Sequence, residues 1–143
     1  MQTPSVRKKY YLSLKKKINA HCYTLDQRLR RFPIKLLNKI KRLEIPEEET
    51  IIIQEESFPL KEKLPELFTN YKELKKKSKA RYYQSYLSSF LKESNKKEAK
   101  EMKEIYVKIE EDLSREIESQ KETLYESLTI LNQTIKFMKK KIA

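Results

Sequence analysis

Apolar residues recur at a helical spacing over the last third of the chain. With Gln120 filling one place, eleven steps of three or four residues cover the 40 residues from Met102 to Ile142, a mean of about 3.6. This is the period of a straight α-helix with one apolar face, whereas a regular coiled coil repeats every 3.5 residues. The pattern predicts one long helix over residues 96–142.

The apolar face of this helix has to be covered. A helix of this length extends on the order of 70 Å, and a second predicted helix over residues 64–92 would leave roughly 17 residues uncovered at about 1.5 Å each. Either the N-terminal helix or another subunit, in a hetero- or homo-oligomer, covers the rest. We expect a partner helix to contact seven positions: Ile109, Leu113, Ile117, Leu124, Leu128, Leu131 and Ile135.

The first third of the chain predicts two further helices. Apolar residues recur every three or four positions from Val6 to Phe32, and the Phe32-Pro33 step marks a boundary because proline breaks a helix interior. A short helix follows up to Leu43. Residues 46–63 are expected to be a linker, in which the β-branched run at 50–54 is compatible with either a strand or a helical turn.

The predicted fold class is therefore all-α, with a helical bundle or a coiled-coil-like arrangement. Residues 1–45 form a basic amphipathic helical region, residues 46–63 a linker, and residues 64–143 a hairpin of two long antiparallel helices. The turn of this hairpin is expected at Ser94-Asn95, because antiparallel helices need only a few connecting residues.

Several classes of function are excluded by composition. The chain has no glycine, which excludes glycine-rich phosphate loops and the dinucleotide-binding fingerprint. One cysteine and one histidine cannot build a zinc site. His21 and Cys22 are adjacent, so on a helix they point about 100° apart and do not form a nucleophile–base pair. We expect no enzyme activity, no metal, no cofactor and no small-molecule substrate.

The positive charge is confined to the first third of the chain. Residues 1–43 carry 13 lysines and arginines against one acid, Asp26, whereas residues 44–143 carry 20 basic and 20 acidic residues. Such a region is a solvated face, a binding surface for nucleic-acid phosphates, or a docking surface for an acidic protein. The residues expected to contact an anionic partner are Arg28, Arg30, Arg31, Lys35, Lys15, Lys16 and Lys17.

The same basic residues are compatible with a membrane surface or an organelle. No run of 18 apolar residues predicts a membrane span, although a basic amphipathic helix also suits an anionic membrane surface. The N-terminus has no acid before Asp26 and resembles a mitochondrial transit peptide. Lysine outnumbers arginine there, which argues against import into mitochondria.

Two short runs resemble parts of chromosome-associated proteins. The proline-centred run from Leu29 to Leu37 resembles a segment of borealin-type chromosomal passenger subunits. The run from Leu64 to Leu67 resembles the N-terminal dimerising region of inhibitor-of-growth proteins, without their PHD finger. We claim membership of neither family.

Both resemblances imply a scaffold subunit of a nuclear, chromosome- or chromatin-associated complex, whose basic N-terminal region contacts nucleic acid or an acidic partner. The alternative is a structural component of a ribonucleoprotein, for example one associated with the ribosome. The cytoplasm is the alternative compartment.

Overall fold

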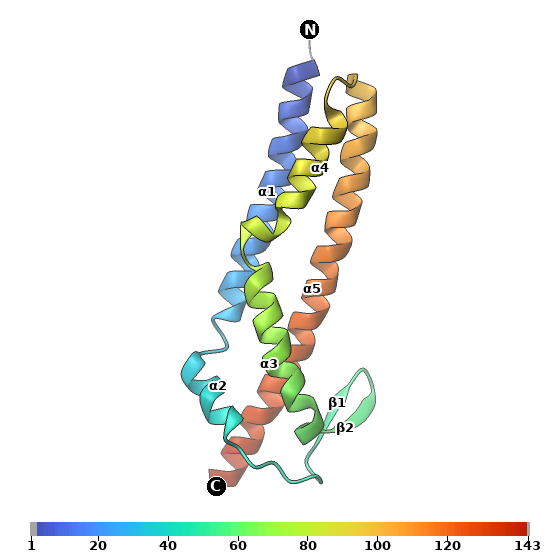
Figure 1. The fold of residues 1–143 in the computed structure, drawn as a ribbon. Helices are drawn as coiled ribbons and strands as arrows, with labels where there is room; N and C mark the ends of the chain where they lie inside the picture. The colour runs from blue at the N-terminus through green and yellow to red at the C-terminus, as the bar shows by residue number, and fades with distance from the viewer. Residues whose placement is uncertain (1–2, 143) are drawn as a thin grey trace. The chain divides into compact units, whose positions relative to one another are not determined.

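The computed structural model describes residues 3–142, and the protein is about 80% helical (Figure 1). The expectation of a predominantly helical protein is confirmed. Five α-helices accompany one two-stranded sheet and one 3-10 helix among the described residues. The elements are α1 (Thr3–Leu29), α2 (Ile34–Lys41), β1 (Thr50–Ile53), β2 (Glu56–Pro59), α3 (Leu60–Lys77), the 3-10 helix η1 (Ala80–Tyr83), α4 (Gln84–Ser94) and α5 (Ala99–Ile142).

The chain forms two compact units, each built from segments that are far apart in the sequence. The first unit comprises the described residues up to Gln27 together with Lys76–Ser119. The second comprises Arg28–Lys75 and the described residues from Gln120 onward. The sequence suggested boundaries near residues 45 and 63, whereas α1, α3 and α5 each contribute residues to both compact units.

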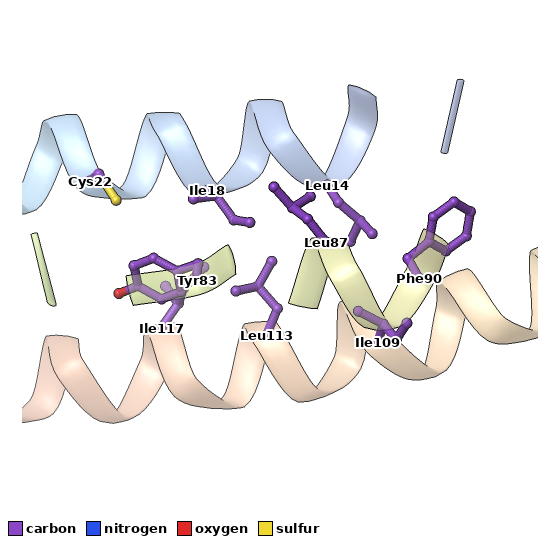
Figure 2. Close-up of a cluster of buried hydrophobic side chains, with 9 residues drawn as sticks. All are labelled: Leu14, Ile18, Cys22, Tyr83, Leu87, Phe90, Ile109, Leu113 and Ile117. Atoms are coloured by element: carbon purple, nitrogen blue, oxygen red, sulfur yellow. The ribbon is translucent and has the colours of Figure 1, made fainter. Parts of the chain in front are cut away.

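The core of the first unit lies between α1, α4 and the first half of α5. Figure 2 shows α1 and α5 facing one another across side chains from η1 and α4. The fully buried Tyr83 packs in this core, and Tyr10 stacks on Tyr106 at its edge with ring centroids 4.7 Å apart. The core residues are Leu14, Ile18, Cys22, Tyr83, Leu87, Phe90, Ile109, Leu113 and Ile117.

The prediction of one continuous helix over residues 64–92 is wrong. Helix α3 begins four residues earlier, at Leu60, which is fully buried and whose backbone N–H donates to the Glu49 carbonyl at 2.9 Å. It ends at Lys77, and η1 precedes α4. The hydroxyl of Tyr83 donates to the Lys77 carbonyl at 2.9 Å. This bond satisfies an acceptor that has no partner within the helix after the break.

In the second unit the buried face of α5 differs from the predicted stripe. Ser127 and Thr134 are fully buried, whereas Leu128 and Ile135 are only half-buried. Each buried hydroxyl donates to the carbonyl four residues earlier, Ser127 at 2.8 Å and Thr134 at 2.7 Å. Because these bonds satisfy the hydroxyls inside their own helix, small polar residues fit a position where the sequence pattern suggested a leucine or isoleucine.

Residues 50–59 form a β-hairpin, which settles the choice between strand and turn. Thr50 pairs with Pro59 and Ile53 with Glu56, so the loop has two residues. Both loop residues, Gln54 and Glu55, have positive φ angles, 49° and 67°. A two-residue loop of this kind prefers Asn-Gly, because side chains with a Cβ are disfavoured in the left-handed region. The chain has no glycine, so two residues with a Cβ adopt the unfavourable left-handed conformation in this loop.

We expect the double substitution Gln54→Asn and Glu55→Gly to raise the free energy of unfolding by about 1 kcal/mol. Urea denaturation followed by circular dichroism measures the change. Ser57→Gly is the control, because it puts glycine at an exposed position of β2 and should lower stability. A double variant no more stable than the wild type would contradict the assignment of strain to this loop.

Two carboxyl groups lie close together in the second unit, Glu66 on α3 and Glu126 on α5. Burial and a hydrogen bond shared with Glu66 raise the pKa of Glu126 above its usual range. A carboxyl group whose pKa is raised on folding binds its proton more tightly in the folded state. Its ionisation therefore lowers stability as pH rises through the folded-state pKa.

Glu126→Gln should accordingly stabilise the protein at pH values above the folded-state pKa of Glu126. This gain should shrink as pH falls through that pKa and be absent below the usual carboxyl pKa of about 4.3. Denaturation midpoints over a pH series test this expectation. Glu122→Gln, at an exposed position of the same helix, is the matched control. A gain that is equal at all pH values would exclude ionisation of Glu126 as the cause.

Candidate anion-binding surface

Most of the basic residues of the first third are exposed. Eleven of the thirteen lysines and arginines in residues 1–43 are exposed, and Arg7 and Lys17 are the two that are half-buried. Lys15 and Lys16, which were expected to contact a partner, are exposed on α1 in the first unit. Exposure makes these side chains accessible to an anion in solvent, and the two half-buried ones form hydrogen bonds within the first unit.

Arg7 and Lys17 connect helices of the first unit. The Arg7 guanidinium donates to the Ser94 hydroxyl at 3.0 Å and also to the Leu91 carbonyl. Lys17 donates to the Glu110 carboxylate and to the Ser114 hydroxyl. Sequence reasoning placed Lys17 with Lys15 and Lys16 as a contact for a partner, but its ammonium group is held by α5.

The four remaining predicted contacts lie at the junction of α1 and α2, in the second unit. We call Arg28, Arg30, Arg31 and Lys35 the basic corner. All four are exposed, whereas Leu29 and Phe32, which lie beside the arginines in the chain, are each only 2% exposed.

The local backbone explains this separation of charged and apolar side chains. The N–H of Arg31 donates to the Arg28 carbonyl at 3.1 Å and that of Phe32 to the Leu29 carbonyl at 3.0 Å, which closes the end of α1. The Phe32 ring then packs against Tyr71 of α3, with centroids 5.7 Å apart. Because the apolar side chains anchor the turn to the core, the arginines are left on its outer side.

Helix α2 adds to this positive surface. Its sequence, Ile34–Lys41, contains three lysines and no acidic residue, and its C-cap is Arg42. Leu37 and Ile40 are its buried residues, so the charged positions lie on the other faces. No carboxylate of α2 offsets its lysines, and the segment from Arg28 to Arg42 is a continuous basic stretch of the chain.

Five of the seven residues expected to contact a partner helix are buried within the protein. Ile109, Leu113 and Ile117 belong to the core of the first unit. Leu124 and Leu131 are buried in the second unit. With Leu128 and Ile135 half-buried, the stripe of α5 has far less uncovered apolar surface than the sequence suggested.

His21 and Cys22 have structural surroundings. Cys22 is buried in the core of the first unit, and burial raises the pKa of its thiol. A raised pKa disfavours the thiolate, which is the nucleophilic form. The buried His21 ring meets Tyr83 edge-on, with centroids 5.9 Å apart. This arrangement favours packing over a nucleophilic role.

Within residues 3–142, no cluster of three or more histidine, cysteine or acidic side chains is placed to hold a metal ion. In the same range, no helix combines the length and apolar character needed to cross a bilayer.

Comparison with protein-family models, with curated proteins and with solved structures finds no match to this chain. The two resemblances noted in the sequence gain no support from these comparisons.

The role of Lys17 was missed, although its position contains a signal. It directly precedes the buried Ile18 on α1, and such flanking positions border the contact with a neighbouring helix. Its partner Glu110 is 93 residues away, and this pairing depends on the fold. Hydrogen bonds from Lys17 and Ser114 lower the pKa of the Glu110 carboxyl.

We expect Lys17→Gln to lower the free energy of unfolding by about 0.5–1 kcal/mol at neutral pH, the range for a partly exposed ion pair. A carboxyl group whose pKa is lowered on folding stabilises the protein above its unfolded-state pKa, and this contribution is lost as pH falls through the folded-state pKa. The deficit of the variant should therefore vanish at acid pH. Denaturation over a pH series, with the exposed Lys16→Gln as control, tests this; equal losses in both variants would contradict it.

Proposed function

We propose that this protein is a non-enzymatic helical scaffold that binds the phosphate backbone of a nucleic acid through its basic corner. The observation that supports the proposal is the exposure of Arg28, Arg30, Arg31 and Lys35 at a junction where Leu29 and Phe32 are buried. Arginine suits this role because its planar guanidinium group makes paired hydrogen bonds to a phosphate.

The distribution of charge favours a polyanion over general solvation. Residues 44–143 are neutral overall, so the net charge of +12 comes from the first 43 residues. Solubility alone does not require such a division. Backbone contacts of this kind position a protein on a nucleic acid without reading the sequence of bases, which agrees with the lack of any base-reading motif in the chain.

The scaffold role depends on surfaces other than the stripe of α5. Because that stripe is largely covered, an assembly partner would have to use apolar side chains that remain exposed, such as Ile34 in the second unit. The nuclear, chromosome-associated setting is part of the proposal and rests on the two sequence resemblances. A ribonucleoprotein component is the alternative, and binding to RNA in preference to DNA would favour it.

Reversal of charge at the basic corner tests the proposal. We expect Arg28→Glu, Arg30→Glu and Arg31→Glu together to weaken binding to duplex DNA about tenfold or more. The slope of log binding constant against log salt concentration should fall by the amount that corresponds to about three phosphate contacts. Fluorescence anisotropy with labelled duplex DNA and structured RNA, over a salt series, provides the measurement. Circular dichroism verifies that helicity is unchanged.

The matched control is Lys8→Glu, Lys15→Glu and Lys16→Glu, which changes the net charge equally at exposed positions of the first unit. A clearly smaller loss in this control supports the basic corner as the site. Equal losses of affinity in the two variants would show that net charge alone, and not the basic corner, determines binding. Salt-independent binding, or binding only to an acidic protein, would overturn nucleic-acid contact.

A further inference from the structure

A groove between α2 and α3 lies in the second unit, and the buried Leu37 of α2 is part of its lining. Its volume is about 330 Å³, which is at the lower end of the range for ligand pockets and suits a few side chains. The residues that line it include Ile34, Leu37 and Lys41 of α2 and Phe68, Tyr71 and Lys72 of α3. The spacing on α2 is that of one helical face.

The floor of the groove is apolar and remains open. Ile34 is 70% exposed, and Phe68 and Tyr71 are half-buried. A single exposed isoleucine is ordinary on a protein surface. Here Ile34 adjoins the aromatic surface of Phe68 and Tyr71. A side chain placed in the groove would therefore bury its own apolar area together with that of these three residues.

The rim of the groove is cationic. The Lys41 ammonium lies 5.3 Å from the centroid of the Phe68 ring, and Lys72 lies on the opposite helix. No aspartate or glutamate is found among the described residues that line the groove. An occupant with both apolar and acidic side chains would match this arrangement.

We propose that this groove binds a short acidic peptide segment of a partner protein. One or two large apolar side chains of the segment contact Ile34, Phe68 and Tyr71, and its carboxylates pair with Lys41 and Lys72. The proposal does not depend on nucleic-acid binding by the basic corner, because it uses a different set of side chains. It supplies the protein contact that a scaffold requires.

Two other occupants fit less well. Nucleic-acid bases bind by stacking on aromatic faces, but Lys41 already lies over the Phe68 ring and Tyr71 is already packed against Phe32. A second copy of the chain would bring two positively charged rims together, which is unfavourable. Both alternatives are separated from the acidic peptide by the experiment below.

Selection from a library of random dodecapeptides on the immobilised full-length protein tests the proposal. We expect the selected peptides to combine aspartate or glutamate with leucine, isoleucine or phenylalanine. Ile34→Asp should weaken binding of a selected peptide about tenfold or more, as loss of a central apolar contact does. Lys41→Gln with Lys72→Gln should weaken it and reduce its salt dependence.

The controls are Ile52→Asp, at a 68% exposed isoleucine of the hairpin in the same unit, and Lys139→Gln, at an exposed lysine of α5. Neither should change peptide affinity. Circular dichroism and the urea midpoint verify the fold of each variant, and the lysine pair provides a second test if Ile34→Asp is unstable.

The proposal is overturned if no peptide is enriched, if the selected peptides lack acidic residues, or if their binding is unaffected by both groove variants. It is also overturned if Ile34→Asp instead abolishes binding of an oligothymidylate probe, which would assign the groove to nucleic acid. Sedimentation equilibrium tests whether a second copy of the chain occupies the groove. A dimer that Ile34→Asp dissociates would assign the groove to that second copy. Unchanged DNA binding in the corner variant, with peptide binding lost in the groove variants, would reject the proposed function alone.

Discussion

The packing of α1 against α5 around Tyr83 determines which side chains of the first unit are free to bind anything. The apolar stripes of both helices meet there, and the interruption after α3 brings the tyrosine ring between them. With the apolar face of α1 covered, its remaining lysines are on the outside. Lys17, at the border of this contact, is drawn into an ion pair with Glu110.

The helices could be predicted because burial imposes their period on the sequence. The break near residue 78 could not, since no proline or glycine marks it and its stability depends on a hydroxyl, that of Tyr83, placed by tertiary packing. The hairpin lacks the glycine that usually signals such a loop. The burial of Ser127 and Thr134 was hidden because their hydrogen bonds lie within their own helix.

The candidate sites divide in a similar way. Charge counting located the exposed arginines of the basic corner, since a cluster of like charges is avoided in a core. The groove was not found from the sequence, because it depends on the distance between α2 and α3. Ile34 reads as an ordinary apolar helix residue, and only its 70% exposure beside Phe68 distinguishes it. Local sequence patterns therefore predict which residues are buried more reliably than they predict a groove between two helices.

The position of Cys22 has a practical consequence. It is the sole sulfhydryl of the chain and lies in the core of the first unit, among Leu14, Ile18 and Tyr83. A thiol-labelling reagent reaches it when that unit opens, so the rate of labelling reports on the opening of the first unit alone. Local fluctuations of the first unit can thus be followed without an engineered probe. The label does not alter the basic corner or the groove, because both lie in the second unit.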